Sequence, residues 1–334
     1  MVEPLRRRVR TRALEGLSRA TARVPDALLR PALGATGSLL ARTRHGALAR
    51  ANLRAALATE LDERELERIA RGVFRHAARI LREWLRLARG APPDGANRER
   101  GAWIEEAVEL DPSVERLERA FARGRGALLV TAHLGNWELL CAALRRAGFR
   151  GKVVGLRRPK DSGSDWLVRM RAGYGVETIA QQSSPRRLLE VLQRGEGLGL
   201  LADLEVRRID GAFLPFFGRE ALTMTAPAAL ARARALPLMP VRCVLPASGA
   251  RAYRLSVEEP LELDPTLERR EATLELTARL NGVFERWIRA TPEQWPWYLD
   301  RWRTRPGEHE ALPFAERRRR KREEGAGGIP LTPR

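Results

Sequence analysis

Apolar positions recur at helical spacing from Leu5 to Leu87, among many arginines. Within residues 61–87, Ile69, Val73 and Ile80 fall on one face of a helix. A stripe of this kind is typical of a helix that packs against a core. The sequence therefore predicts an N-terminal helical region over residues 1–100.

After residue 100 the pattern alternates between short apolar runs and helical stretches. The apolar runs predict strands at residues 103–108, 127–132, 152–156, 176–180, 197–202 and 238–245. Helical spacing lies between them, at residues 112–122, 166–172 and 185–193. Strands that alternate with helices predict an α/β fold, in which a mostly parallel central sheet is flanked by helices. A later run at residues 253–257 predicts an edge strand, and residues 266–290 predict a long helix.

These patterns divide the chain into three segments. Residues 1–100 are the helical extension, residues 101–305 the α/β domain, and residues 306–334 a basic tail that is predicted to be flexible. For residues 1–40 two interpretations stay open. Leucines on one face and arginines on another suit a helix that lies on an anionic bilayer, but they suit an ordinary helical cap equally well.

The charge of the chain narrows its partners. Of its 334 residues 44% are hydrophobic, and 61 Lys and Arg face 42 Asp and Glu, which gives a net charge of +19. This charge favours nucleic acid, an anionic membrane surface or an acidic carrier protein. No nucleic acid is expected, because the sequence has neither zinc-finger spacing nor an aromatic RNA-binding pattern. An arginine bias of the genome is an alternative source of the charge, and composition does not separate the two.

The cysteines and the uncharged stretches indicate the redox compartment of the protein, whether it binds a metal ion and whether it spans a membrane. Two cysteines without a cleavable signal pattern predict a reducing compartment and no structural disulfide. Cys141 and Cys243 show no ligand spacing, and His-Glu-x-x-His is missing from the sequence, so no metal is expected. The uncharged stretch at residues 31–41 is far shorter than the roughly 20 residues that span a bilayer, so no transmembrane helix is predicted.

A candidate catalytic pair follows the predicted strand at residues 127–132. His133 ends this strand, Asn136 suits the N-cap of the next helix, and Glu138 falls in its first turn. We expect the intervening turn to bring Glu138 back to one imidazole nitrogen. A histidine oriented in this way can remove a proton from a hydroxyl as a general base. A lone His/Glu pair can also be purely structural, so the neighbouring motifs decide between the two interpretations.

These motifs resemble those of a known family. His-Leu-Gly-Asn-Trp-Glu at residues 133–138 resembles the His-x4-Asp/Glu block of glycerolipid acyltransferases, in the form found in lipid A lauroyl and myristoyl transferases and in mycobacterial phosphatidylinositol mannoside acyltransferases. Further blocks match in the same order: Arg158-Pro159, Asp203-Leu204-Glu205, the Phe-Phe-Gly segment at residues 211–218, Thr223-Met224-Thr225 and Pro292-Glu293-Gln294-Trp295. Together they cover roughly residues 101–305.

The resemblance implies a glycerolipid-acyltransferase-like fold and an O-acyltransferase. The donor would be an acyl-carrier protein or acyl-CoA, and the acceptor a hydroxyl of a glycolipid, first of all a lipid A precursor. No cofactor is implied. The expected place is the cytoplasmic face of the inner membrane, as a peripheral protein. Alternatives are a lysophospholipid or phosphatidylinositol mannoside acyltransferase and, in another class, a non-catalytic protein that binds anionic membranes or nucleic acid.

The resemblance also implies site residues. His133 and Glu138 would be catalytic, and Arg158, Asp203, Asn136 and Gly135 would bind substrate or the oxyanion. Because His133 and Asp203 each end a predicted strand, we expect them to share one crevice. Two alternatives remain: Arg158 can pair with Asp161 on a loop, and Asp203 can cap its strand.

Aromatic residues supply candidates for a lipid site. Phe213, Phe216 and Phe217 are candidates for an acyl pocket, because each buried methylene of a lipid tail contributes about 0.8 kcal/mol. Packing in the core is the alternative for them. The cluster Trp295, Trp297, Tyr298 and Trp302 suits either a bilayer interface or a packed C-terminal segment.

Two departures from the family pattern bear on substrate preference. Leu299-Asp300-Arg301 stands where relatives commonly have His-Arg-Arg, and Asp203-Leu204-Glu205 ends in Glu rather than Asp. The preference for donor or acceptor is therefore expected to differ from that of typical members.

Overall fold

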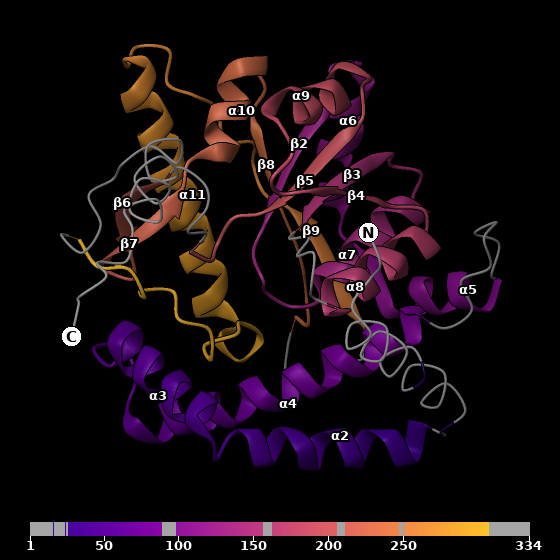
Figure 1. The fold of residues 1–334 in the computed structure, drawn as a ribbon, viewed down its shortest axis with the longest axis vertical. Coiled ribbons are helices and arrows are strands. Elements are labelled where there is room, and N and C mark those ends of the chain that lie inside the picture. The colour runs from indigo at the N-terminus through magenta and orange to yellow at the C-terminus, as the bar shows by residue number, and fades with distance from the viewer. Residues whose placement is uncertain are drawn as a thin grey trace, which may run out of the picture.

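The fold is of the α/β class, with a central sheet flanked by helices and a helical layer formed by the N-terminal part of the chain (Figure 1). A computed structural model describes residues 26–88, 98–155, 162–205, 211–246 and 252–306, together with residues 16, 24 and 250. Arg158 and most of the predicted basic tail lie outside the described residues. The expected α/β class, with a mostly parallel central sheet and an N-terminal helical region, is confirmed.

The central sheet has seven strands in the order β1-β9-β8-β2-β5-β3-β4. Its strands are β1 (Val108–Leu110), β2 (Ala127–Thr131), β3 (Gly151–Gly155), β4 (Glu177–Ala180), β5 (Gly197–Leu201), β8 (Leu238–Val244) and β9 (Tyr253–Val257). All neighbours pair in parallel except β8 and β9, which are antiparallel. The buried central strand β2 lies between β5 and β8, so the residues that follow β2 and β5 emerge at the same edge.

Helices cover both faces of this sheet. They are α5 (Arg98–Ala107), α6 (Glu115–Ala122), α7 (Trp137–Arg146), α8 (Ser162–Gly173), α9 (Pro185–Gln193), α10 (Ala226–Arg234) and α11 (Arg269–Ala290), with short 3-10 turns η1 (Pro112–Val114) and η2 (Pro292–Gln294). Leu128 and Val130 of β2 belong to the core cluster that holds α11, whereas Ala127 and Leu129 belong to the one that holds α7. Alternate residues of β2 therefore support two separate core layers.

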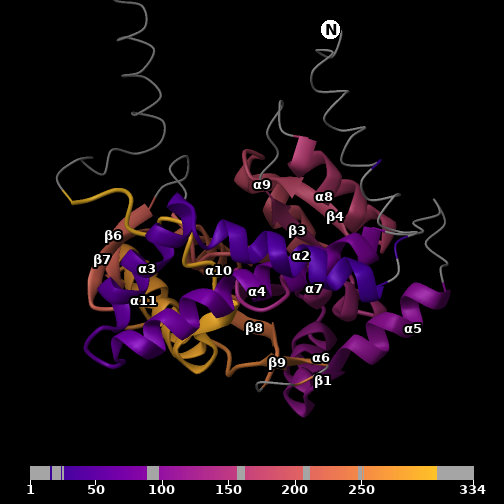
Figure 2. The same ribbon diagram turned by 90° about the horizontal axis from the view of Figure 1, so that it is seen from below.

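Three helices precede the sheet: α2 (Asp26–Leu40), α3 (Arg44–Leu57) and α4 (Glu63–Ala88). They lie along one side of the molecule, and α2 packs along α4 (Figures 1 and 2). Helix α4 spans both core layers, since Ile69 and Val73 join one cluster and Leu87 the other. The predicted packing of residues 61–87 against a core is thus confirmed.

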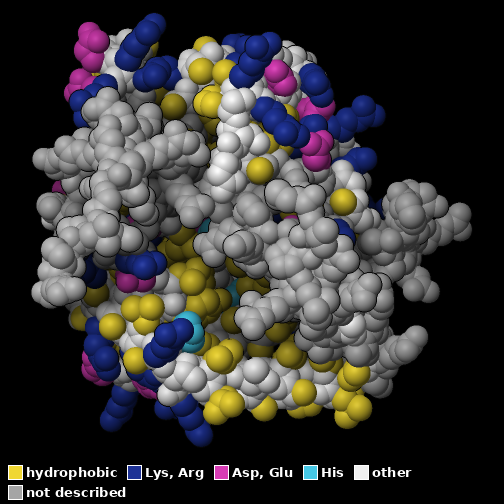
Figure 3. All heavy atoms as spheres, viewed as in Figure 1, with side chains coloured by type: hydrophobic (Ala, Val, Ile, Leu, Met, Phe, Trp, Pro, Cys, Tyr) yellow, Lys and Arg dark blue, Asp and Glu magenta, His cyan; other side chains and the backbone are white. Residues whose placement is uncertain are grey.

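The outer side of α2 is apolar and exposed. Leu28 is 63% and Leu39 65% exposed, and hydrophobic side chains line the lower edge of the molecule where α2 lies (Figure 3). Among the described residues, no helix combines the length and the hydrophobicity that a membrane crossing requires.

One strand prediction is wrong, and another strand is not at the expected place in the sheet. Residues 103–107 lie in helix α5 and only Val108 lies in a strand, β1. Trp103 and Ile104 are buried side by side and the next two residues are exposed, which fits a helix face and not the alternation of a strand. The run at residues 253–257 does form a strand, β9, but it is not at the edge, since the three-residue strand β1 pairs outside it.

The Phe-Phe-Gly segment forms an antiparallel hairpin that the sequence did not predict. Its strands are β6 (Gly211–Phe216) and β7 (Arg219–Met224), and they form a separate two-stranded sheet. Strand β6 packs against α11. The hairpin therefore adds to the core at one side of the molecule, where Phe216 packs against Trp295.

Candidate active site

His133 lies in a tight loop at the carboxyl end of β2. This His133 loop, residues 132–136, leads directly into α7. Gly135 has φ +63°, and a Cβ atom there would lie 2.0 Å from the carbonyl oxygen of Cys243. Only glycine fits both the left-handed backbone and this close approach to β8. The loop is therefore held in one conformation by the neighbouring strand.

Asp203 is the residue that holds His133. It follows β5, and its Oδ1 lies 2.8 Å from the imidazole Nδ1, while its Oδ2 accepts the backbone N–H of His133 at 2.9 Å. Trp295 donates its indole N–H to the same Oδ2 at 2.8 Å. His133 and Asp203 are brought into contact because both emerge at the carboxyl ends of adjacent parallel strands. Asp203 itself is fully buried with both oxygens engaged, which does not support its predicted role in binding substrate or the oxyanion.

The charge state of Asp203 follows from these contacts. Burial alone would raise the pKa of its carboxyl, but the attraction of His133 and the hydrogen bonds from His133 and Trp295 outweigh burial and lower it. An ionised Asp203 accepts a hydrogen bond from Nδ1–H, so the neutral imidazole carries its free lone pair on Nε2. The side chain of His133 remains 25% exposed, which leaves Nε2 available to a reactant.

Glu138 does not contact His133 in this way, and the expected His133–Glu138 pairing is wrong. Glu138 is fully buried and accepts hydrogen bonds from Arg171 Nε at 2.9 Å and from Tyr174 Oη at 2.8 Å. Burial opposes the charge of Arg171, but the attraction of Glu138 raises its pKa above the ordinary value. Because Glu138 points toward α8, it fixes the first turn of α7 against α8 rather than orienting the imidazole.

The expected oxyanion roles of Gly135 and Asn136 are also wrong for their backbone amides. The N–H of Gly135 donates to the carbonyl of Gln294 at 3.1 Å, and the N–H of Asn136 donates to the carbonyl of Cys243 at 2.9 Å. Both donors are therefore used by the fold. The Asn136 side chain caps α7 as predicted, since its Oδ1 accepts the N–H of Leu139 at 3.1 Å.

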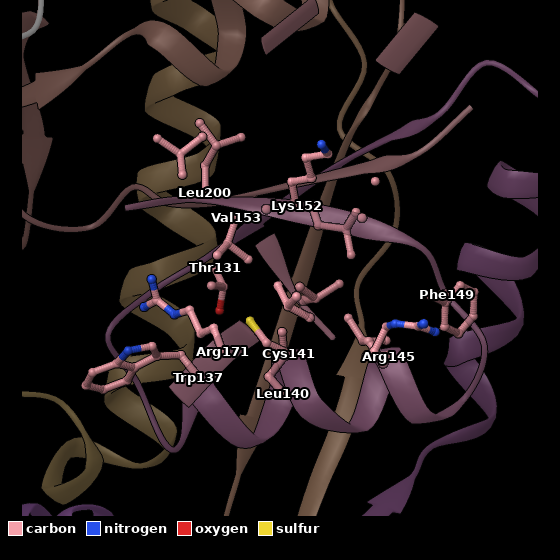
Figure 4. Close-up of a pocket in the computed structure, with 18 of the residues that line it drawn as sticks. Thr131, Trp137, Leu140, Cys141, Arg145, Phe149, Lys152, Val153, Arg171 and Leu200 are labelled. Carbon is pink, nitrogen blue, oxygen red and sulfur yellow. The ribbon is translucent and has the colours of Figure 1, made fainter. Parts of the chain in front are cut away.

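An apolar cavity of about 80 Å³ lies between α7 and the sheet. Trp137 and Arg171 stand at one end of it and Phe149 and Arg145 at the other (Figure 4). The Trp137 ring is also in edge contact with the His133 ring, with centroids 5.0 Å apart. The cavity thus begins beside the catalytic candidate and runs along α7.

Glycines on adjacent strands make room for this cavity. Gly151, Gly197 and Gly199 all line it. A Cβ atom at Gly199 would lie 3.2 Å from Cγ1 of Val153, so even a methyl group would enter a space that is already narrow. A side chain at Gly199 would therefore narrow the cavity beside Val153.

The phenylalanines do not belong to this cavity, since neither the hairpin nor its aromatic residues line it, and their role in an acyl pocket stays a prediction. Phe216 is fully buried against Trp295 and Trp302, and Phe217 packs on Trp297. Phe213 lies on the same hairpin and is half-buried. Of the two interpretations of the tryptophan cluster, packing is the one that the structure supports, because all three indoles are buried.

The residues at the two motif departures are structural contacts. Glu205 accepts hydrogen bonds from the backbone and hydroxyl of Thr304 at 2.9 and 2.6 Å. Arg301 is fully buried and donates to the carbonyl of Leu222 and the hydroxyl of Thr223, and burial lowers its pKa to about 10. Both side chains tie the C-terminal segment to the core, and the negative charge of Asp203 partly opposes the lowering of the Arg301 pKa.

Sequence reasoning missed Arg171 and Tyr174 as partners of Glu138, and no pattern in the sequence marks either. It also missed Trp295 as the second donor to Asp203, although Trp295 belongs to a matching motif block. Arg158, predicted to bind substrate, lies outside the described residues. Among the described residues, no group of three or more His, Cys, Asp or Glu side chains is placed to hold a metal ion.

Comparison with known proteins places these residues in a family context. Residues 10–304 match the family of bacterial lipid A biosynthesis acyltransferases. The lipid A biosynthesis lauroyltransferase of Escherichia coli (strain K12) is 29% identical over 198 residues, which are 58% of this chain and 61% of that protein. The lipid A biosynthesis palmitoleoyltransferase of the same organism is 27% identical over 202 residues, again 58% and 61%. The phosphatidylinositol mannoside acyltransferase of Mycolicibacterium smegmatis is 28% identical over 140 residues, 41% of this chain and 46% of that protein.

Proposed function

This chain belongs to the bacterial lipid A biosynthesis acyltransferase family, and we propose that it transfers a fatty acyl chain from a thioester to a hydroxyl of a glycolipid. The alignable part covers 61% of the length of the lipid A relatives, so the activity is inferred from the site as well as from the family. The observation that carries the proposal is the pair formed by His133 and buried Asp203, placed beside an apolar cavity.

In the proposed reaction His133 is the general base. Its Nε2 removes the proton of the acceptor hydroxyl while the hydroxyl oxygen attacks the thioester carbonyl. Asp203 holds the ring through Nδ1 and stabilises the imidazolium that forms. The tetrahedral intermediate then collapses, the C–S bond breaks, and the imidazolium returns the proton to the leaving thiolate. Oxyanion stabilisation by Arg158 remains a prediction of the family resemblance.

The cavity along α7 is the proposed acyl site, in place of the phenylalanine hairpin. Its lining is mostly apolar, and it passes Leu140, Cys141 and Val153 on its way from Trp137 to Phe149. A methylene chain that enters the cavity is transferred out of water, which stabilises the complex by about 0.8 kcal/mol per buried methylene. The thioester carbonyl would then lie at the Trp137 end, next to His133.

The donor and the acceptor are proposed by chemical class. An acyl-carrier protein or acyl-CoA supplies the thioester, and the net charge of +19 favours either anionic donor. The acceptor is a glycolipid, with a lipid A precursor as first candidate and a phosphatidylinositol mannoside as second. The second candidate follows from the similarity to phosphatidylinositol mannoside acyltransferases.

Helix α2 is proposed to place the enzyme on an anionic membrane, as a peripheral protein of the cytoplasmic face. Leu28 and Leu39 on its outer side are well exposed, and Arg42 and Arg44 follow its end. An apolar face next to arginines is typical of a helix that lies in the headgroup region. Sedimentation with phosphatidylglycerol vesicles tests this placement. The double substitution Leu28→Gln and Leu39→Gln should weaken vesicle binding about tenfold, whereas Leu110→Gln on edge strand β1 should not weaken it. Equal binding by the wild type, the double variant and Leu110→Gln would refute the placement of α2 on the membrane.

The activity is tested with the full chain in detergent. Acyl-carrier protein or CoA charged with a radiolabelled fatty acyl chain is mixed with a lipid A precursor, with a phosphatidylinositol mannoside, or with a lysophospholipid. We expect a labelled glycolipid product, and none from His133→Ala. Labelled lysophospholipid alone would move the acceptor to another class. Lipid binding without any labelled product would identify a non-catalytic binder and refute the proposal.

Mass spectrometry of glycolipids from cells with and without the gene identifies acceptor and chain length together. The expected difference is one acyl chain on one glycolipid. An unchanged glycolipid profile in cells that also lack related acyltransferases would contradict the proposed acceptor class.

A further inference from the structure

Helix α4 contacts the His133 loop through three side chains. His76 Nε2 lies 3.3 Å from the carbonyl oxygen of Gly135. Trp84 donates its indole N–H to Asn136 Oδ1 at 3.1 Å, and Glu83 accepts a hydrogen bond from Asn136 Nδ2 at 2.8 Å. The N-terminal helical region, which the sequence set apart from the α/β domain, therefore supports the backbone that carries the proposed general base.

Glu83 is the centre of these contacts. It is buried, and it accepts hydrogen bonds from Arg79 Nε, Asn136 Nδ2 and Tyr253 Oη, each at 2.8 Å. A buried carboxylate is costly unless such donors surround it. The three donors come from α4, from the His133 loop and from β9. Glu83 thus ties the loop both to the helical layer and to the central sheet.

The contact with Glu83 also decides which way the Asn136 amide faces. With Nδ2 directed at Glu83, Oδ1 accepts the N–H groups of Trp84 and Leu139, both at 3.1 Å. A reversed amide would place its NH₂ against these two donors and its oxygen against a carboxylate. Glu83 therefore stabilises the orientation in which Asn136 caps α7.

The start of α7 in turn forms the wall beside His133. Trp137 is the first residue of α7, and its ring lies edge-on to both His133 and Trp84, with centroids 5.0 and 5.1 Å apart. A displacement of the helix start moves this ring against the imidazole. Misplacement of a catalytic group by about 1 Å can lower turnover about 100-fold.

We propose that Glu83 is a positioning residue for the reaction, which acts on His133 through Asn136 and the first turn of α7. The proposal rests on the acyl transfer proposed above. It assigns to the N-terminal helices a part in turnover, in addition to their part in membrane placement.

Reversal of the hydrogen-bond polarity tests this proposal. In Glu83→Gln an amide NH₂ faces the NH₂ of Asn136, and in Asn136→Asp a carboxylate faces Glu83; each substitution breaks the contact. In the double variant the new amide on α4 can donate to the new carboxylate in the His133 loop, while the amide oxygen still accepts from Arg79. Each single variant should lower kcat about 10- to 100-fold with little change in KM, and the double variant should regain most of it.

Glu67→Gln is the matched control on the same helix. Glu67 also accepts hydrogen bonds from arginines, but these donors, Arg50 and Arg71, belong to α3 and α4 rather than to the His133 loop. Its substitution should leave kcat unchanged. Two results would overturn the proposal. In the first, kcat falls in each variant only in proportion to the loss of folded protein; in the second, the double variant regains its Tm but not its kcat.

A readout without turnover separates this proposal from the proposed function. The Nδ1 proton that His133 shares with buried Asp203 should give a downfield proton resonance that is missing in Asp203→Asn. We expect this resonance to broaden or shift in Glu83→Gln and to return in the double variant. If the wild type transfers no acyl chain, the acyl-transfer proposal fails, while an unchanged resonance in Glu83→Gln refutes the positioning role by itself.

Discussion

Asp203 holds His133 by two hydrogen bonds, one to the imidazole Nδ1 and one to the backbone N–H, although the residues are 70 positions apart in the chain. Each oxygen of the carboxylate serves one of these contacts. The ring is thereby fixed in both orientation and tautomer, which is the arrangement that a histidine base requires.

Asp203→Asn should remove most of the activity. An asparagine retains the shape but lacks the negative charge that stabilises the imidazolium, so kcat is expected to fall about 10³- to 10⁴-fold. Steady-state kinetics with a labelled acyl donor measure this effect. Glu205→Gln, whose parent carboxylate bonds Thr304, should keep nearly full activity. Similar kcat values for the two variants would contradict the proposed role of Asp203.

Arg171→Met should destabilise the protein strongly. It removes the cation that pairs with the fully buried carboxylate of Glu138 and leaves the hydroxyl of Tyr174 as a neutral donor, and an unpaired buried charge costs about 3–5 kcal/mol. Urea unfolding followed by circular dichroism gives the free energy of unfolding. Arg145→Met removes an arginine that bonds the exposed backbone of Gly175 and should cost less than about 1 kcal/mol. Equal losses would show that the Glu138–Arg171 pair has no special weight.

Gly199→Ala should shorten the acyl chain that is accepted. The added methyl group enters the cavity near Val153, so long-chain donors should lose about 10-fold or more in kcat/KM relative to short ones. A series of acyl donors of increasing length provides the measurement. Gly282→Ala on α11, where a Cβ atom has open space, is the control. If the chain-length profile of Gly199→Ala matches that of the wild type, the acyl chain does not use this cavity.

His76 should make stability sensitive to mild acid. Burial lowers the pKa of its imidazole to about 4, so the folded state favours the neutral ring. The stability that depends on this neutral ring is fully present above the unfolded pKa of about 6.5 and is lost as the pH falls toward 4, by about 3 kcal/mol in total. The free energy of unfolding of the wild type should therefore fall more steeply over this range than that of His76→Gln. Parallel curves would contradict the assignment.

Most strands of the sheet could be predicted because buried strands appear in the sequence as short apolar runs. The runs that became β2, β3, β4, β5 and β8 are bounded by helical spacing or turn residues, which local sequence shows well. Strand β1 could not be predicted, since it is three residues long and follows directly on a helix. The apolar residues of α5 resembled a strand because they form a short run in the sequence.

The site was predictable as far as topology determines it. Adjacent parallel strands bring His133 and Asp203 together, and the sequence marked both strand ends. The partner of Glu138 could not be predicted, because Arg171 lies 33 residues further on and the spacing from His133 to Glu138 does not reveal which way the side chain points. The amides of Gly135 and Asn136 are likewise engaged by residues distant in sequence.

The contacts between α4 and the His133 loop have a consequence for protein engineering. A truncation that begins at residue 101 would follow the apparent domain boundary, yet it would deprive the Asn136 amide of Glu83 and Trp84 and uncover the apolar residues around Leu87. The minimal unit for expression, crystallisation or inhibitor screening must therefore include α4. Compounds that bind between this helix and the loop would act on His133 from outside the proposed substrate site.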